Sequence, residues 1–519
     1  MILKQENGMN NIKVLLISIS KSIRYSNAGI DLIAGFLRIN GFEVDIKYFY
    51  KDETYEEIIT QISTDYTVYG MSVYSSNYER FLKLSEYLKE KCNAVVVWGG
   101  AFPSMYYKDI FSVSRSIAYI ILGDGERPFL YLLKRIENEK SVSHASIATY
   151  TDFKHKKNAC NENITYLPAY DFYNYVVPER NSEKIHCIQS KNNVCTGNCS
   201  FCYERKGKIF YKSIDLIVEE INYVNENFGV KKFFFSDDNL LDPNDICAKK
   251  RMISLCDALL KLNKKLIFTC YIKATSFNKS DFDSKILSLM RKTGFTTMFI
   301  GIESGNEEDL LLYNKKTTVE DNLNIVNILK RHDIIPQIGF INFNPYTTPE
   351  KLKKNYEFLV EIGSNNLYSF ARSFMNIYKG TAIYNKANKD GLIKSSYTIL
   401  NDLEYDFSNS DIKPIVIFLR EKLIPKIEKL QVETSWLIQR CKDCSVINPK
   451  AEQYIEILSA YENEEANIIK NYFYILYVDR DLKKSEQKLD EFISYFINIQ
   501  PQLKQIYSQI KKLYIESDY

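Results

Sequence analysis

The 519-residue sequence contains no run of about 18 uncharged apolar residues, which excludes an ordinary membrane-spanning helix. Its formal net charge is only +3, and a balance this close to neutral gives no indication of binding to nucleic acid or to a membrane surface. The first residues lack the basic region followed by an apolar core that a secretory signal peptide has. We therefore expect a soluble cytoplasmic protein with no nucleic-acid or membrane partner.

Cysteine is also sparse in this sequence. The 11 cysteines of this long chain do not form the dense pattern of a small disulfide-stabilised secreted domain. Hydrophobic residues make up 45% of the sequence, which is ample for real hydrophobic cores. The length predicts roughly two to four such domains.

One segment, Cys195-Thr-Gly-Asn-Cys199-Ser-Phe-Cys202, nevertheless brings three cysteines together within eight residues. A loop this short can direct three thiolates at one centre, and thiolates bind iron–sulfur clusters or zinc. No Cys or His occurs between Cys202 and Cys247 to close a four-ligand site. Three ligands would leave one metal position open for chemistry. A structural zinc loop and cysteines buried as small apolar side chains are the alternatives.

The Cys-x3-Cys-x2-Cys spacing, with Phe201 before the last cysteine, resembles the cluster loop of radical S-adenosylmethionine (SAM) enzymes. The resemblance implies that Cys195, Cys199 and Cys202 hold a [4Fe–4S] cluster whose fourth iron is chelated by SAM. One electron would cleave SAM to a 5′-deoxyadenosyl radical, which abstracts hydrogen from carbon. The resemblance also implies an electron donor such as flavodoxin or ferredoxin, and adenine contacts from Phe201 and Tyr203.

Strand and helix patterns alternate between residues 185 and 400, which predicts an open barrel of six strand–helix units related to the eight-stranded one. The predicted strands comprise residues 185–190, 231–239, 266–274, 296–303, 335–343 and 367–377. Functional residues of such barrels lie at the carboxyl ends of the strands. The cluster loop, Asp237, Asp238, Lys273 and Glu303 all fall at such ends, as a single site would require.

Two motifs in this region also resemble the radical SAM family. The segment Phe235-Ser-Asp-Asp-Asn239 resembles a second-strand motif near the methionyl end of SAM, and Gly301-Ile-Glu-Ser-Gly305 resembles a fourth-strand motif near its ribose or methionine moiety. The resemblance implies that Asp237, Asp238 and Glu303 contact SAM. Lys273 stands where relatives often have arginine, and it could pair with a carboxylate as a point charge. A strand-end turn or a helix cap is the alternative role for either aspartate.

Residues 1–150 alternate in a similar way. Apolar strand patterns at 12–18, 42–48, 67–73, 94–100 and 116–122 are interspersed with helix patterns, which predicts a Rossmann-like, doubly wound parallel sheet. Ligands of such sheets bind beyond the carboxyl ends of the strands, where glycine permits close approach of the backbone. The candidate residues at these ends are Ser72, Gly99, Gly100, Gly123, Gly125 and Glu126. Simple turns are the alternative explanation for the glycines.

This pattern resembles the cobalamin-binding domain of one large class of radical SAM enzymes, with matches at Val68–Val73, Trp98–Pro103 and Leu122–Phe129. The resemblance implies that the strand-end residues contact cobalamin. None of the four histidines lies on a strand end of this domain, and Phe102 stands where many relatives have histidine. We therefore expect cobalamin bound without a histidine ligand to cobalt, or a domain that has lost the cofactor.

The remaining segments complete the predicted organisation. Residues 151–184 are a polar linker, and residues 401–519 form a C-terminal helical domain with helix patterns at 412–440, 451–461, 464–478 and 485–510, the last broken at Pro501. Cys441 and Cys444 could be half of an auxiliary metal site or a pair of unligated thiols.

The resemblance spans roughly residues 12–400 and implies a cobalamin-dependent radical SAM enzyme. The first hypothesis for its reaction is methylation of an unactivated carbon in a small-molecule or peptide precursor. The second is a rearrangement, cyclisation or oxidation without methyl transfer. The third, from another class, is a non-catalytic cobalamin- or metal-binding sensor, which would be expected to have a broken cysteine motif.

Overall fold

The computed structural model describes residues 12–516, except residues 21, 23, 155, 161–162, 176–183, 193, 204–206, 243–244, 365, 428–429, 431–432, 435–436 and 439–453. The chain divides into two compact units. Unit 1 comprises Met1–Thr196, Glu204–Leu240 and Ser254–Asn263. Unit 2 comprises Gly197–Tyr203, Leu241–Ile253 and Lys264–Tyr519.

Unit 1 contains a six-stranded sheet with the strand order β2-β1-β3-β4-β5-β6. Its strands are β1 Lys13–Ser20, β2 Glu43–Tyr50, β3 Val68–Ser72, β4 Val95–Gly99, β5 Tyr119–Ile121 and β6 Ile147–Ala148. The first five are parallel and the short β6 is antiparallel to β5. The central β1 is apolar without alternation because both of its faces are buried. The predicted doubly wound sheet is confirmed.

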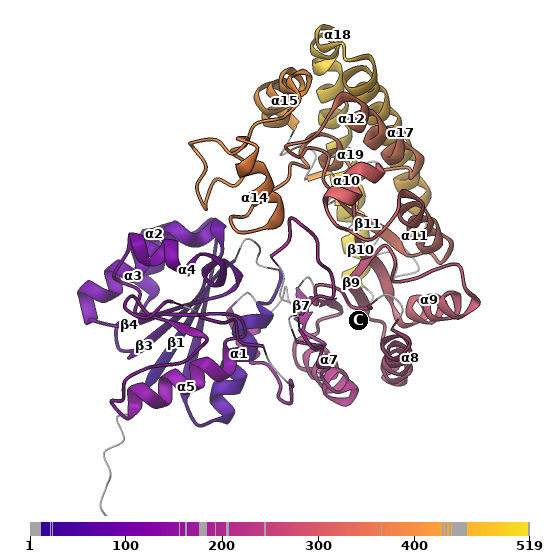
Figure 1. Cartoon of the computed structure of the whole chain (residues 1–519). Coiled ribbons are helices and arrows are strands. Elements are labelled where there is room, and N and C mark those ends of the chain that lie inside the picture. The colour runs from indigo at the N-terminus through magenta and orange to yellow at the C-terminus, as the bar shows by residue number, and fades with distance from the viewer. Residues whose placement is uncertain are drawn as a thin grey trace, which may run out of the picture. The chain divides into compact units, whose positions relative to one another are not determined.

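Five helices pack on this sheet, with α1 and α5 on one face and α2, α3 and α4 on the other (Figure 1). They are α1 Ala28–Ile39, α2 Tyr55–Gln61, α3 Tyr78–Cys92, α4 Ala101–Val113 and α5 Glu126–Glu137. The sequence interpretation missed α2 and α4. A signal for α2 existed, because Thr54 and Glu57 form a reciprocal capping box at its start.

Unit 1 also includes the first part of the predicted barrel. Strands β7 (Ile185–Ile188) and β8 (Lys232–Phe235) are parallel, and α7 (Ile214–Phe228) connects them. Helix α7 begins after the N-cap Ser213 and ends at Gly229, whose φ of +67° favours glycine, as the sequence predicts. The short helix α6 (Phe172–Tyr175) lies in unit 1, within the predicted linker, and α8 (Ile246–Lys261) has residues in both units.

Unit 2 continues the alternation with a parallel sheet in the order β11-β10-β9. The elements are β9 Ile267–Lys273, α9 Asp281–Thr293, β10 Phe295–Glu303, α10 Glu307–Leu312, α11 Val319–Arg331, β11 Ile335–Phe340 and α12 Pro349–Glu361. The expected sixth strand is reduced to a single parallel bridge between Phe374 and Phe343. Helix α13 (Leu367–Ala371) occupies its first half, because Leu367, Phe370 and Ala371 are buried at helical spacing.

The C-terminal region is helical, as predicted. It comprises α14 Ala382–Lys389, η3 Ser410–Ile412, α15 Lys413–Phe418, η4 Leu419–Leu423, α17 Ile455–Tyr474, η6 Ile475–Asp479, α18 Leu482–Gln487 and α19 Leu489–Glu516. The predicted break between 461 and 464 is wrong, since α17 runs through it. The predicted break at Pro501 is also wrong, because α19 continues through this proline.

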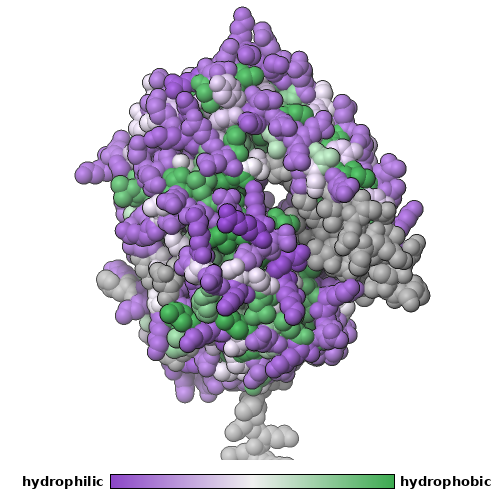
Figure 2. All heavy atoms as spheres, turned by 90° about the vertical axis from the view of Figure 1, so that its right-hand side faces the viewer, coloured by the Kyte–Doolittle hydropathy of each residue, from purple (hydrophilic) through white to green (hydrophobic). Residues whose placement is uncertain are grey.

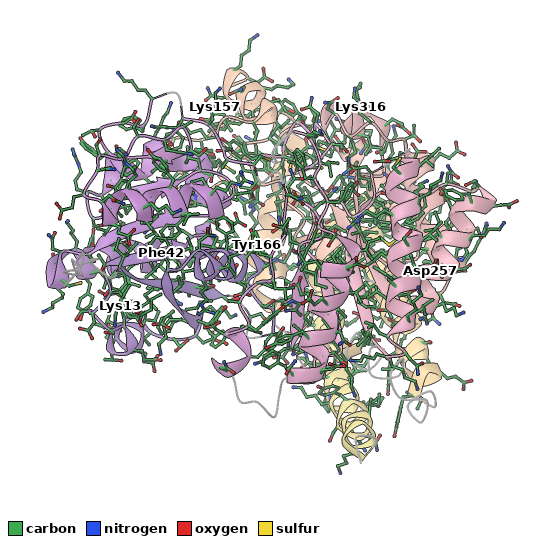
Figure 3. All side chains as sticks on the ribbon, turned by 90° about the horizontal axis from the view of Figure 1, so that it is seen from below. Lys13, Phe42, Lys157, Tyr166, Asp257 and Lys316 are labelled. Carbon is green, nitrogen blue, oxygen red and sulfur yellow. The ribbon has the colours of Figure 1, made fainter. Side chains whose placement is uncertain are left out.

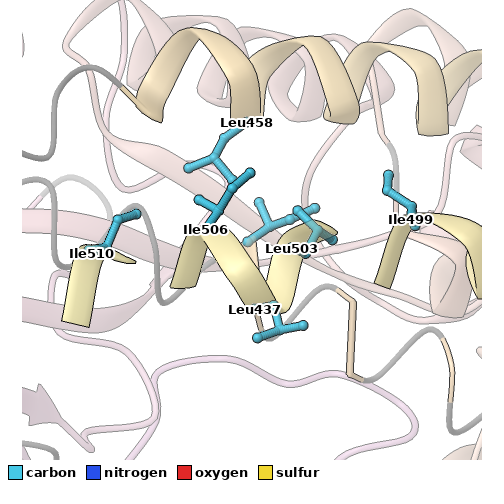
Figure 4. Close-up of a cluster of buried hydrophobic side chains, with 7 residues drawn as sticks. Leu437, Leu458, Ile499, Leu503, Ile506 and Ile510 are labelled. Atoms are coloured by element: carbon cyan, nitrogen blue, oxygen red, sulfur yellow. The ribbon is translucent and has the colours of Figure 1, made fainter. Parts of the chain in front are cut away.

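The reason for the continuity of α19 is visible in the core of this region (Figure 4). Ile499, Leu503, Ile506 and Ile510 form one buried stripe that spans Pro501 and packs with Leu458 and Leu437. Burial of each such side chain contributes about 1.5–3 kcal/mol. Together they outweigh the cost of about 3 kcal/mol for a proline inside a helix.

Hydrophilic side chains cover most of the face shown in Figure 2, and the apolar ones lie among them in small groups. This distribution is ordinary for a protein surface. None of the described helices combines the length and the apolar character needed to cross a membrane.

Candidate functional site

The three cysteines of the short loop are distributed over both units, with Cys195 in unit 1 and Cys199 and Cys202 in unit 2. Cys195 and Cys199 are half-buried, and Cys202 is exposed. Partly accessible cysteines suit cluster ligation, because the thiolate is the form that binds metal. The described residues contain no preformed group of three metal ligands. The assignment of the cysteines therefore depends on their spacing and donor chemistry.

Asp237 anchors the chain at the start of this loop. Its carboxylate accepts hydrogen bonds from the backbone N–H groups of Ser190 and Lys191, both at 3.0 Å, and from the Ser190 hydroxyl at 2.6 Å. Only 2% of the side chain is exposed. Both oxygens of this predicted SAM ligand thus have partners at the end of β7. Its neighbour Asp238 is exposed.

The buried Asp237 gives a testable pH dependence. Burial raises the pKa of Asp237 to about 6, although the hydrogen bonds from Ser190 and the positive charge of Lys191 oppose this shift. A folded-state pKa above the unfolded value of about 3.9 means that the free energy of unfolding decreases as pH rises from about 4 to 6. We expect Asp237→Asn to remove about 2 kcal/mol of this decrease, since asparagine does not titrate. Its amide oxygen can accept the two backbone N–H groups, and its NH2 group can donate to the Ser190 hydroxyl. The urea midpoints of both proteins at pH 4.5 and pH 7 test this. A difference between the two proteins that does not change with pH would contradict it.

Glu303 ends strand β10 in an unusual conformation. Its φ is +67°, a left-handed value that few residues other than glycine adopt, and the register of β10 with β11 shifts there. Such strain is concentrated at functional sites. The Glu303 carboxylate accepts a hydrogen bond from Lys315 Nζ at 3.1 Å. A Cβ at Gly301 would lie 2.6 Å from Glu303 Oε1 and 2.7 Å from Lys315 Nζ, so a side chain there would displace the ends of both ion-pair partners.

The other predicted SAM contacts occupy strand ends and the cysteine loop. Lys273, at the end of β9, pairs with Asp242 at 3.8 Å. Phe201 packs edge-to-face on Tyr313, with ring centroids 5.6 Å apart. Tyr203 is 39% exposed. The sequence interpretation did not assign Lys315 to the site.

The strand order of the six-stranded sheet reverses between β1 and β3, and ligands of doubly wound sheets bind at such a switch point. Asn27, the N-cap of α1, donates hydrogen bonds there to Ser18 Oγ at 2.9 Å and to Ser72 Oγ at 3.5 Å. Ser18 and Asn27 were not singled out from the sequence. A Cβ added at Gly99 would meet no atom within 4 Å, so there is open space beside Gly99. Small polar side chains beside this space fit a flat, polar cofactor.

The remaining cobalamin candidates divide into two groups. Gly100 and Gly123 have φ values of +110° and +82°, so both loops need glycine. Gly125 and Glu126 instead make internal contacts. A Cβ at Gly125 would lie 2.6 Å from Ile33, and Glu126 accepts a hydrogen bond at 3.0 Å from the hydroxyl of Tyr166, which Figure 3 labels.

The described histidines lie in other local networks. His144 accepts a hydrogen bond from the Ser146 N–H, His332 contacts two serine hydroxyls, and His186 pairs with Tyr173 and Glu220. None of these three lies on a strand end of the six-stranded sheet, as predicted. Phe102 packs between Tyr78 and Tyr106. His155, Cys441 and Cys444 lie outside the described residues.

Comparison with protein-family models identifies two regions of the chain. Residues 190–359 match the Radical SAM superfamily, and residues 17–133 match the B12 binding domain. The chain is a cobalamin-dependent radical SAM enzyme. Its cofactors are therefore a [4Fe–4S] cluster, SAM and cobalamin, and like other radical SAM enzymes it needs a reductant.

Known relatives of the enzyme differ in their named reactions. It is 23% identical to the anaerobic magnesium-protoporphyrin IX monomethyl ester cyclase of Synechocystis sp., over 71% of this chain and 73% of the relative. It is also 23% identical to the bacteriochlorophyllide d C-12(1)-methyltransferase of Chlorobaculum tepidum, over 75% and 79% of the two chains.

Solved structures share the fold of the enzyme at low sequence identity. The cobalamin-dependent radical enzyme OxsB, with aqua-cobalamin and SAM bound, aligns with a TM-score of 0.68 and 16% identity over 98% of this chain and 81% of that chain. The radical SAM methyltransferase TsrM from Kitasatospora setae, with cobalamin and a [4Fe–4S] cluster bound, aligns with a TM-score of 0.56 and 16% identity over 73% and 75%.

Proposed function

We propose that this enzyme transfers a methyl group to an unactivated carbon of a small-molecule or peptide natural-product precursor. When bound, the cluster supplies the electron that cleaves SAM to the hydrogen-abstracting 5′-deoxyadenosyl radical, and cobalamin supplies the methyl group. The observation that carries the proposal is the presence of both domain matches in one chain. Two relatives named as methyltransferases support it: one aligns at 23% identity over 75% of this chain, and the other shares the fold.

In this proposal Cys195, Cys199 and Cys202 hold the cluster through their thiolates. Asp237 fixes the backbone where the loop leaves β7. Its neighbour Asp238 remains exposed and available for a contact with SAM.

Glu303 binds a hydroxyl or ammonium group of SAM, because a carboxylate accepts hydrogen bonds from either. Lys315 orients that carboxylate through its ion pair. Lys273 offers a second positive charge at the end of β9. The rings of Phe201 and Tyr203 contact the adenine.

The cobalamin residues in this proposal are Ser72, Gly99, Gly100 and Gly123, at the carboxyl-end edge of the six-stranded sheet. Gly125 and Glu126 support this edge by packing against α1 and the linker. No histidine is assigned to cobalt.

A reaction without methyl transfer is the second candidate. It is favoured by relatives named as a magnesium-protoporphyrin ester cyclase and, at 22% identity over 51% of this chain, as the 4′-phospho-dehydrooxetanocin synthase of Priestia megaterium. The same radical would then lead to a cyclisation, rearrangement or oxidation of the substrate.

One experiment separates these candidates without a known substrate. The protein is purified anaerobically, reconstituted with iron, sulfide and hydroxocobalamin, and incubated with SAM and dithionite. We expect about one cobalamin per chain and formation of S-adenosylhomocysteine, because methylation of the reduced cobalt consumes the methyl group of SAM. Bound cobalamin with 5′-deoxyadenosine as the only SAM product would favour the second candidate. No bound cobalamin, with an intact cluster, would overturn methyl transfer and leave hydrogen abstraction without methylation.

We expect Glu303→Gln to weaken SAM binding by about 10- to 100-fold, since a charge-assisted hydrogen bond contributes roughly 1.5–3 kcal/mol. Equilibrium dialysis with labelled SAM measures the change, and iron content should stay constant. The matched control is Glu308→Gln, which alters an exposed carboxylate paired with Lys351 at 3.5 Å. Equal affinities of the two variants would remove Glu303 from the site.

A further inference from the structure

The cysteine loop is fastened to a segment more than 100 residues away in the sequence. Between Cys199 and Cys202, the Ser200 N–H donates a hydrogen bond to the Tyr313 carbonyl at 2.8 Å, and the Ser200 hydroxyl donates to the Leu312 carbonyl at 2.7 Å. Residues 312–314 form the end of α10 and the turn after it. All of these residues belong to unit 2.

Tyr313 holds residues 312–314 in place through its buried side chain. Its side chain is fully buried, and its hydroxyl accepts a hydrogen bond from the Asn344 amide at 2.8 Å. Its ring packs on Phe201, the residue before Cys202. The ring and the backbone of one buried residue therefore both contact the loop.

Asn314 adds a contact on the other side of Cys199. Its side-chain amide donates a hydrogen bond to the Asn198 carbonyl at 2.7 Å. The backbone of Asn314 is left-handed, with φ +51°, a conformation that asparagine tolerates better than most residues. The next residue is Lys315, the partner of Glu303. One turn thus places an amide on the cysteine loop and an ammonium group on the carboxylate.

We propose that Asn314 is a positioning residue for the iron–sulfur cluster: its amide fixes the peptide before Cys199, and its left-handed backbone presents Lys315 to Glu303. This inference rests on the proposed assignment of the three cysteines to the cluster. Hydrogen bonds to the peptides of a ligand loop restrict the directions of its thiolates, and such supporting contacts affect how tightly a metal site is held. Loss of the amide frees the loop and exposes the cluster to chelation.

The test uses the full-length protein with a reconstituted cluster. Asn314→Gly keeps the left-handed backbone accessible but removes the amide. We expect the half-life of the cluster under an iron chelator to fall by about five-fold, as the loss of one hydrogen bond predicts. The EPR spectrum of the reduced cluster should broaden. The matched control is Asn263→Gly, an exposed asparagine with φ +51° in unit 1, which should leave both properties unchanged.

The outcomes distinguish this inference from the proposed function. If the wild type binds no cluster, or if Cys199→Ala keeps one, the cysteine assignment fails. If the wild type binds a cluster and Asn314→Gly behaves as Asn263→Gly does, only the role of Asn314 is overturned. Should Asn314→Gly not fold, Asn314→Asp provides the same comparison, because it removes the amide donor to the Asn198 carbonyl.

Discussion

Replacement of Cys199 by alanine is expected to abolish the iron–sulfur cluster and, with it, the cleavage of SAM. Cys199 is the middle ligand of the proposed three, and two thiolates with the spacing of Cys195 and Cys202 leave two irons of the cluster without a protein ligand. Iron and sulfide per chain after anaerobic reconstitution, together with 5′-deoxyadenosine formed in the presence of dithionite, measure the effect. Both should fall to background.

The matched control for this experiment is Cys247→Ala. Cys247 is an exposed cysteine, and it lies on α8, outside the three-cysteine loop. This variant should keep the full cluster and the full rate of cleavage. Cluster retention in Cys199→Ala, or equal loss in both variants, would show that the loop is not the site of the cluster.

Among the substitutions proposed for this protein, Lys212→Met is expected to lower the free energy of unfolding most, by about 3–5 kcal/mol. The reason is that it leaves the buried carboxylate of Glu220 without its ammonium partner. Lys212 and Glu220 are 1% and 2% exposed and form a close ion pair in unit 1. The charge of Lys212 and the hydrogen bond from His186 hold the pKa of Glu220 below its usual value, although burial opposes them. The stabilisation is therefore present at neutral pH and is lost as pH falls through the acidic range. The shift of the urea midpoint at pH 7 measures it.

Two controls make this prediction specific. In Lys212→Met with Glu220→Gln, no uncompensated charge remains, so most of the loss should be recovered. Lys13→Met breaks an ion pair of 3.6 Å with Glu43 whose side chains are about half exposed, and we expect less than about 1 kcal/mol there (Figure 3). Similar losses for Lys212→Met and Lys13→Met would contradict the role of burial.

Short-range sequence patterns were sufficient to predict much of the fold and to locate the loop with three cysteines. The uninterrupted apolar run of β1 indicated a strand buried on both faces, and Ser213 and Gly229 marked both ends of α7. The spacing of three cysteines depends only on neighbours within eight residues. The failures at residues 367–377 and at Pro501 have one cause, which is that burial of a side-chain stripe outweighed the local preference.

The sequence by itself determined which chemistry the chain carries, since thiolate spacing and strand-end carboxylates are properties of short segments. Only the tertiary structure decided the partner of each polar group. Asp237 accepts hydrogen bonds from Lys191 and Ser190, which lie 46 and 47 positions away in the sequence. The partner of Glu126 lies 40 positions away, and that of Glu303 lies 12 positions away. Sequence does not reveal these pairs, because a buried polar group pairs with whatever donor the packing of distant elements places beside it, and leaving it unpaired costs about 1–3 kcal/mol.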